Sequence, residues 1–288
     1  MSEWVLGVLG GSGLYGIEGL EGGWRTVETP WGAPSDQIFD ATLHGQRVLF
    51  LPRHGRGHRL TPSNVNYRAN IDALKRAGCT DVLSFSACGS LRAELAPGTF
   101  VMVDQYIDRT HARETSFFGA GLVAHVSMAH PVCPRLAGFA AQAARDVGAP
   151  THEGGTYLAM EGPQFSSLAE SKLYRSWGCD VIGMTNMPEA KLAREAEMPY
   201  ASVCMVTDFD CWHEEVEAVS VTNVLEVLSS NAHIAQRLLG QLVLHLRNTP
   251  RLASPIDTCL DFALITPPEA RDRALVAKIA AMARFAPF

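Results

Sequence analysis

The fold is decided by residues 200–207, which read YASVCMVT. This stretch, Tyr200–Thr207, is apolar on both faces, as is typical of a strand in a sheet covered on both sides. Six further short apolar runs alternate with amphipathic stretches and are also expected to be strands: Trp4–Leu9, Arg47–Leu51, Asp81–Phe85, Thr99–Asp104, Thr156–Met160 and Val181–Met184. The alternation predicts an α/β protein, a three-layer fold with a central mixed β-sheet flanked by helices.

Helices are expected in the amphipathic stretches between the strands. They are Asn64–Ala77, Pro134–Val147, Ser167–Trp177, Met187–Glu195 and Val221–Leu246. After Asn248 the sequence becomes TPRLASP, which is typical of a linker, and a last amphipathic stretch runs from Pro267 to Phe285. We therefore expect a main domain over 1–248 and a linker with an appended helix over 249–288.

Composition excludes several classes of function. The 288 residues carry 24 Lys+Arg against 30 Asp+Glu, a net charge of −6, without a basic run. A chain with this net charge and no basic run is not expected to bind nucleic acid or an anionic membrane surface. An acidic N-terminus disfavours a secretory signal. The 7 cysteines include no C-x-x-C pair, which predicts a reducing, cytoplasmic setting.

A glycine-rich loop follows the first expected strand. Gly11–Gly16 reads GSGLYG and matches the dinucleotide-binding pattern G-x-G-x-x-G. The residues that follow, however, interrupt the helix that would hold a pyrophosphate. Three interpretations stay open: a dinucleotide loop, a plain turn, and a turn that closes on one phosphate through backbone N–H groups and the Ser12 hydroxyl.

Two further loops at strand ends favour an anion. Residues 52–59 read PRHGRGHR, whose clustered Arg and His side chains between glycines suit a phosphate, although a solvated basic loop has the same composition. His54 and His58 have the i, i+4 spacing of a metal pair, but the glycines between them disfavour a helix, so no metal is expected. Residues 84–90, SFSACGS, place small residues after another strand, where backbone N–H groups can approach an oxyanion.

Carboxylates mark the candidate chemistry. Residues 161–167 read EGPQFSS and offer Phe165 as a base-stacking ring or a core residue, with serines that could cap a helix. Asp208 and Asp210 follow the most apolar strand, where acids are costly unless they bind something. They are the best acid/base candidates in the chain, with a helix cap or salt bridge as the alternative.

Seven segments in order resemble one family. They are Gly10–Leu14, Arg53–Arg56, Val65–Asn70, Ala87–Leu91, Glu161–Pro163, Met184–Thr185 and Thr207–Trp212. Together they are similar to the 5′-methylthioadenosine phosphorylases, which belong to the trimeric purine nucleoside phosphorylases, from about Val5 to Leu246. The resemblance implies a homotrimeric pentosyltransferase, or a hexamer, that uses phosphate as co-substrate and no cofactor.

The resemblance also implies a role for each matching residue. Phosphate would contact Ser12, Arg53, His54, Ser86, Ala87 and Thr185. Asp208 and Asp210 would face the purine edge. Phe165 would stack near the base, Ser166 would also contact substrate, and Met184 would lie under the ribose. His125, from a neighbouring subunit, would form the 5′ pocket with Val221, Val224 and Leu225.

The implied reaction is phosphorolysis of 5′-methylthioadenosine to adenine and 5-methylthioribose 1-phosphate, in purine and methionine salvage. Its oxocarbenium-like transition state needs a nearby anion and an acid for the departing base. An Asp titrates near about 3.9, so Asp208 needs burial and a like-charged neighbour to donate at neutral pH. A carboxylate would accept from the adenine amino group and reject a 6-oxopurine.

Departures from the family pattern keep alternatives open. Ser12 and Ser86 replace the frequent Thr, Gln164 replaces Arg, and Gly183 and Asn186 replace Asn and Thr. These changes leave the 5′ substituent unsettled. The alternatives are a 6-oxopurine nucleoside or methylthioinosine phosphorylase, a nucleotide-cofactor oxidoreductase, and a non-catalytic purine sensor.

Overall fold

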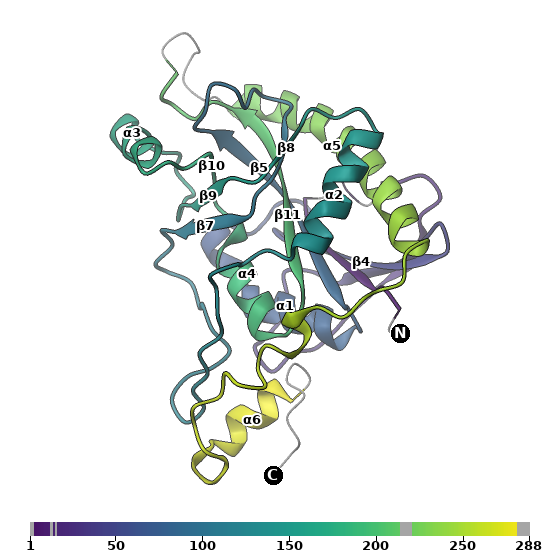
Figure 1. Ribbon diagram of the computed structural model, residues 1–288, viewed down its shortest axis with the longest axis vertical. Coiled ribbons are helices and arrows are strands. Elements are labelled where there is room, and N and C mark those ends of the chain that lie inside the picture. The colour runs from purple at the N-terminus through teal and green to yellow at the C-terminus, as the bar shows by residue number, and fades with distance from the viewer. Residues whose placement is uncertain (1–2, 12–13, 15, 214–220, 281–288) are drawn as a thin grey trace.

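A mixed β-sheet forms the middle layer of the protein (Figure 1). The computed structural model describes residues 3–11, 14, 16–213 and 221–280, and in that part of the chain eleven strands join in one sheet. The strands are β1 (Leu6–Gly10), β2 (Glu21–Arg25), β3 (Ile38–Leu43), β4 (Gln46–Pro52), β5 (Asp81–Ser90), β6 (Phe100–Met102), β7 (Gln105–Asp108), β8 (Thr151–Glu153), β9 (Thr156–Ala159), β10 (Val181–Gly183) and β11 (Tyr200–Asp208).

Helices cover both faces of the sheet, as expected for three layers. They are α1 (Tyr67–Arg76), α2 (Pro134–Asp146), α3 (Leu168–Ser176), α4 (Asn186–Glu195), α5 (Val221–Arg247) and α6 (Arg273–Ile279), with short 3-10 turns η2 (Pro62–Asn64), η3 (Pro255–Thr258) and η4 (Pro268–Ala270). None of these described helices has both the length and the apolar character needed to cross a membrane.

Successive side chains of the central strands point into two separate hydrophobic cores. Val203 of β11 packs with Leu136 of α2 and the α5 side chain Leu239. Cys204, the next residue, faces the other core with Ile71 of α1 and Leu192 of α4. This alternation follows from the two-residue period of a strand and explains why β11 is apolar on both faces.

Strand β5 is the hub of the sheet. It pairs in parallel with β1 and β11 and, at its last residues, antiparallel with β10. The ends of β1, β4, β5 and β11 therefore meet at one edge, where loops that carry ligand groups gather in α/β sheets. Because β10 runs back along β5 from Ser90, the residues after β10 approach Ser86.

All seven strands and five helices expected from the sequence are confirmed, with small shifts of their ends. One expectation about β5 is wrong: residues 86–90 continue the strand instead of forming a loop, because β11 and β10 supply backbone partners as far as Ser90. Strands β2, β3, β7 and β8 were not expected; β2 contains two glycines and β8 is only three residues long, so neither has a clear strand pattern.

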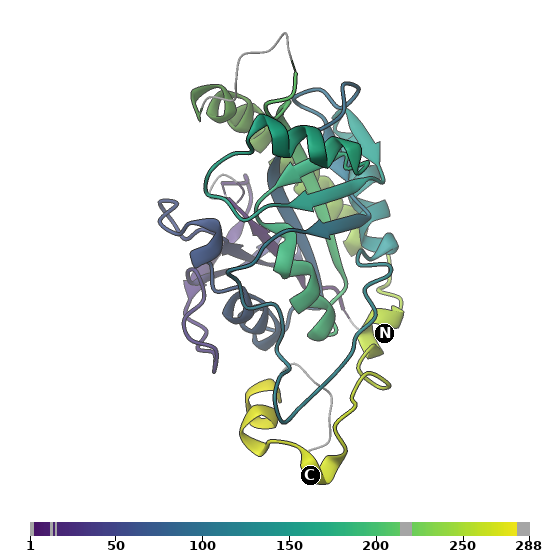
Figure 2. The ribbon, with the colours of Figure 1, turned by 90° about the vertical axis from the view of Figure 1, so that its left-hand side faces the viewer.

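The tail packs against a long connection from the main domain. The segment around His125 pairs with it: the backbone N–H of His125 donates to Ala263 at 2.8 Å, and Ala124 bridges Leu264. Both segments lie together at the end of the molecule that carries α6 (Figures 1 and 2). The final helix expected over Pro267–Phe285 is seen as α6, and residues 281–288 lie outside the described part.

A buried acid anchors the start of the same connection. Glu195 of α4 accepts hydrogen bonds from the Ser116 hydroxyl at 2.8 Å and the Phe117 N–H at 2.7 Å. Burial raises the pKa of Glu195 from 4.5 to about 7. Between pH 4.5 and about 7, Glu195 is therefore protonated in the folded protein and ionised in the unfolded chain.

This raised pKa predicts a pH-dependent stability. The stabilisation is complete below pH 4.5 and is lost as the pH rises through about 7, at a cost of up to roughly 3 kcal/mol. Urea unfolding between pH 5 and pH 8 should show this loss in the wild type and a smaller one in Glu195→Gln. Equal pH slopes for the two proteins would contradict the assignment.

Candidate active site

Two acids and a set of hydroxyls lie along the same pair of strands. In the parallel pairing of β5 with β11, Asp208 stands opposite Gly89, and Ser86 lies three residues earlier on β5. At about 3.3 Å per residue, Gly89, which faces the acid, lies roughly 10 Å along the strand from Ser86. The distance suits a ligand with an anion at one end and a heterocycle at the other.

The carboxylate of Asp208 is held in place from two sides. Its Oδ1 accepts the N–H of Asp210 at 2.8 Å, and its Oδ2 accepts the Thr207 hydroxyl at 2.7 Å. A Cβ at Gly89 would lie 2.9 Å from Oδ1, so the strand approaches the acid closely only because residue 89 is glycine. Burial raises the pKa of Asp208, and the two hydrogen bonds oppose that shift.

Asp210 has a different environment. It is buried, its φ is 52°, and its Oδ2 has no hydrogen-bond partner among the described residues. Burial raises the pKa of Asp210, and the neighbouring Asp208 charge raises it further. Neither acid forms an ion pair with a described residue, so both are available to a ligand.

The hydroxyls of the anion site come together as the resemblance implies. Ser86 Oγ lies 2.9 Å from Thr185 Oγ1, although the two residues are far apart in the sequence. Both side chains are buried, while Ala87 beside them is partly exposed. Two hydroxyls from distant segments thus meet beside a partly exposed part of β5.

Arg53 lies at the same edge but is already paired. Its Nε donates to Glu189 Oε2 at 2.7 Å, and Nη2 donates to Glu189 Oε1 at 3.0 Å. Nη1 donates to the Phe85 carbonyl at 3.0 Å, which leaves its second N–H without an acceptor among the described residues. The Glu189 carboxylate compensates most of the arginine's charge.

His54 is neutral in this setting. Its Nδ1 lies 2.9 Å from the Leu60 carbonyl, and its ring stacks on His58 with centroids 4.4 Å apart. Burial lowers the pKa of His54 to about 4, and the Arg53 charge adds to the effect. The proton therefore sits on Nδ1, and Nε2 can accept a hydrogen bond. The anion site relies on hydrogen bonding more than on net positive charge.

The segment 161–167 lies over the acid loop. The Ser166 carbonyl accepts the Cys211 thiol at 3.3 Å, and a Cβ at Gly162 would lie 2.4 Å from the Met184 sulfur. Phe165 is 49% exposed, so its ring is free to cover a ligand. Ser167 caps α3 in a capping box with Glu170, which leaves Ser166 without a capping role.

His125 lies against the tail, where its backbone N–H donates to the Ala263 carbonyl at 2.8 Å, and the implied approach of its side chain to a neighbouring subunit stays a prediction. Ser12 lies outside the described residues. Val221, Val224 and Leu225 begin α5, but their side chains are also outside the described part.

Three buried polar residues were missed by sequence reasoning. Glu189 binds Arg53, and the hydroxyl of Tyr157 lies near Ser86. Arg113 donates to the carbonyls of Met184 at 2.6 Å and Glu161 at 2.7 Å and so joins the two segments around the ligand space. Nothing in their local sequence distinguishes them from other polar residues, because their partners are distant in the chain.

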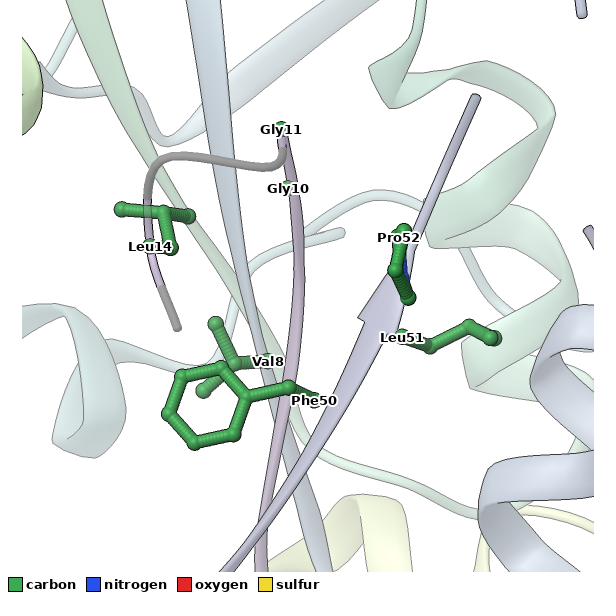
Figure 3. A pocket seen from close by; sticks show the side chains of 7 residues that line it. All are labelled: Val8, Gly10, Gly11, Leu14, Phe50, Leu51 and Pro52. Carbon is green, nitrogen blue, oxygen red and sulfur yellow. The ribbon is translucent and has the colours of Figure 1, made fainter. Parts of the chain in front are cut away.

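An apolar pocket lies between the ends of β1 and β4 (Figure 3). It is lined by Val8, Gly10, Gly11, Leu14, Phe50, Leu51 and Pro52. Its lining includes no charged side chain. The described residues also include no group of three or more His, Cys, Asp or Glu able to hold a metal ion.

Comparison with known proteins identifies the family. The phosphorylase superfamily matches residues 5–244, which include every strand and helix that builds the site. The chain belongs to the phosphorylase superfamily. The dinucleotide interpretation of Gly11–Gly16 is not needed to explain this membership.

Close relatives of this phosphorylase are S-methyl-5′-thioadenosine phosphorylases. The protein of Cereibacter sphaeroides is 60% identical over 282 residues, with 97% of each chain covered. That of Rhodospirillum rubrum is 60% identical over 281 residues, covering 97% of this chain and 96% of its own.

Solved structures agree with the fold of this phosphorylase. A methylthioadenosine phosphorylase from an antarctic soil metagenomic library has a TM-score of 0.92 at 46% identity, with 98% of this chain and 100% of the other covered. The Schistosoma mansoni methylthioadenosine phosphorylase in complex with adenine has a TM-score of 0.82 at 34% identity, covering 98% and 99%. The three-layer α/β fold and the family expected from the sequence are confirmed.

Proposed function

We infer that this protein is a pentosyltransferase that cleaves S-methyl-5′-thioadenosine with phosphate, releasing adenine and 5-methylthioribose 1-phosphate. The observation that carries the inference is the placement of Asp208 opposite Gly89 with Ser86 three residues away on the same strand. An acid for the base and hydroxyls for the phosphate are thus held about one nucleoside length apart. The names of relatives that are 60% identical support the same reaction.

Phosphate would bind where Ser86 and Thr185 meet. One hydroxyl proton of this pair, the Ala87 N–H and the second N–H of Arg53 Nη1 are the donors, with Ser12 completing the set. His54 Nε2 accepts the hydroxyl of hydrogen phosphate, because the neutral ring carries its proton on Nδ1. The anion held there stabilises positive charge on the sugar as the glycosidic bond breaks.

The acid pair would serve the base. Burial raises the pKa of both Asp208 and Asp210, and the charge on Asp208 raises that of Asp210, so the pair keeps a proton more readily than free aspartates do. That proton can pass to N7 of the departing purine. A carboxylate oxygen at the purine edge accepts from the adenine amino group and disfavours a 6-oxopurine.

The remaining parts of the proposal concern the substrate's 5′ end and the assembly. Phe165 and Ser166 contact the base, Met184 lies under the ribose, and Val221, Val224, Leu225 and a neighbouring subunit's His125 enclose the methylthio group. The working enzyme is a homotrimer, with a hexamer as the alternative, in the cytoplasm. It uses phosphate as co-substrate and requires no metal or organic cofactor, serving purine and methionine salvage.

Phosphate dependence is the direct test. With S-methyl-5′-thioadenosine, adenine should appear rapidly when phosphate is present and at least about 100-fold more slowly after phosphate is removed, because the attacking group is then missing. Adenine release is followed by chromatography, in parallel with inosine as substrate. Equal rates with and without phosphate would identify a hydrolase and overturn the proposal; faster cleavage of inosine would favour a 6-oxopurine phosphorylase.

A further inference from the structure

The phenol of Tyr157 occupies the place of a side chain that residue 183 lacks. Tyr157 of β9 is fully buried, and β9 pairs in parallel with β10 so that Gly183 lies diagonally across from it. A Cβ at Gly183 would lie 2.0 Å from the Tyr157 hydroxyl and 2.7 Å from its Cζ. Because contacts below 3.0 Å require movement, this phenol and any side chain at residue 183 exclude each other.

The hydroxyl of Tyr157 reaches two members of the anion site. It accepts the backbone N–H of Thr185 at 3.4 Å and lies 3.5 Å from Ser86 Oγ. Burial raises the pKa of Tyr157, so the phenol keeps its proton and can donate it. With its oxygen accepting from Thr185, its O–H can donate to Ser86 Oγ.

This arrangement limits the directions of the other hydroxyls. Ser86 Oγ and Thr185 Oγ1 are 2.9 Å apart, so one donates to the other, and Ser86 Oγ also lies 3.2 Å from the Ala87 carbonyl, a second acceptor. If Ser86 accepts from Tyr157 and donates to Thr185, the Thr185 proton is left to point at the anion. If Thr185 donates to Ser86, the Ser86 proton can turn from the Ala87 carbonyl to the anion.

We propose that Tyr157 is a positioning residue for the co-substrate phosphate, which acts through Ser86 and Thr185 and depends on the absence of a side chain at Gly183. The proposal rests on the function inferred above, because it takes Ser86 and Thr185 as phosphate ligands. In this proposal Tyr157 does not contact the nucleoside. Loss of its hydroxyl should therefore weaken the binding of phosphate and leave the binding of the nucleoside unchanged.

Tyr157→Phe tests the hydroxyl alone. We expect the KM for phosphate to rise about fivefold, the size of one lost hydrogen bond, while the KM for S-methyl-5′-thioadenosine changes less than about twofold. The inhibition constant of sulfate, used as a phosphate mimic, should rise in parallel. Tyr106→Phe is the matched control, because the Tyr106 ring packs edge-on against Tyr157 with centroids 5.9 Å apart, while its hydroxyl bonds Ser202 Oγ at 2.7 Å instead of Ser86 or Thr185.

The outcomes separate the two proposals. A wild type that releases adenine without phosphate overturns the inferred function. A wild type that needs phosphate, together with an unchanged phosphate KM in Tyr157→Phe or an equal change in Tyr106→Phe, overturns the role of Tyr157 alone.

A second pair of variants tests the dependence on Gly183. Gly183→Ala should lower the melting temperature and raise the phosphate KM, because the added methyl group displaces the phenol. Adding Tyr157→Met to Gly183→Ala should restore the melting temperature but not the phosphate KM, since methionine has no hydroxyl. Loss of stability in the double variant equal to that in Gly183→Ala would contradict the proposed exclusion.

Discussion

Replacing Asp208 with asparagine is expected to lower kcat/KM for S-methyl-5′-thioadenosine by at least about 100-fold, the lower end for loss of a general acid. Burial raises the pKa of Asp208 and so favours its protonated form, whereas an amide has no acidic proton to give to N7. With its oxygen in the place of Oδ1, the amide still accepts the Asp210 N–H, and the Thr207 hydroxyl, which loses its acceptor at Oδ2, keeps the Cys88 carbonyl at 3.2 Å. The loss should therefore appear in turnover and leave thermal stability nearly unchanged.

Inosine provides the internal comparison for Asp208→Asn. The amide N–H can donate to a 6-oxo group that the carboxylate would repel, so the loss on inosine should be less than about tenfold. Asp104→Asn serves as the control, because this exposed acid follows β6 and contacts the Gly155 N–H. Equal losses on both nucleosides would refute the assignment of Asp208 to the purine edge.

Replacing Glu189 with alanine is expected to destabilise the protein by about 3–5 kcal/mol, because it leaves a buried guanidinium without its partner. Arg53 and Glu189 have side-chain exposures of 3% and 1% and an Nε–Oε2 distance of 2.7 Å. Glu189 also accepts the Tyr200 hydroxyl at 2.8 Å, so the variant leaves a second buried donor without its acceptor. Urea unfolding at one protein concentration measures the loss.

A double variant separates the ion pair's two roles. Arg53→Met with Glu189→Leu should recover about half of the stability, since two apolar side chains leave no uncompensated charge. It should not recover phosphorolysis, and the KM for phosphate should stay raised about 10- to 100-fold through loss of a charge-assisted donor. Recovery of wild-type phosphate binding in this variant would show that Arg53 has no part in the anion site.

The fold was largely predictable because its strands are short apolar runs with distinct ends. Asp208 and Asp210 stood out for the same reason, since charge directly after an apolar strand is unusual. Glu189 could not be found in this way: it lies in an ordinary amphipathic stretch, and its importance comes from Arg53, which is 136 residues away. The extension of β5 beyond Phe85 could not be predicted either, because it depends on pairing with β10 and β11, which are distant in the sequence.

Glycines were informative at one position of the sequence, Gly89, and uninformative at another, Gly183. Gly89 indicated a close approach of the backbone to another group, and the structure shows that this group is the carboxylate of Asp208. The expected approach of a bound oxyanion stays a prediction. Gly183 looked like a departure from a family pattern, with no sign of what fills its place. Only the pairing of β9 with β10 shows that Tyr157 does so.

The continuity of β5 has a consequence for engineering. In the function proposed above, backbone geometry sets the spacing between the phosphate and the departing base, because Ser86 and Gly89 belong to one uninterrupted strand. A bulkier heterocycle cannot be accommodated by lengthening that spacing. It needs a remodelled opposite wall, over residues 161–167, where the exposed Phe165 ring leaves room for redesign.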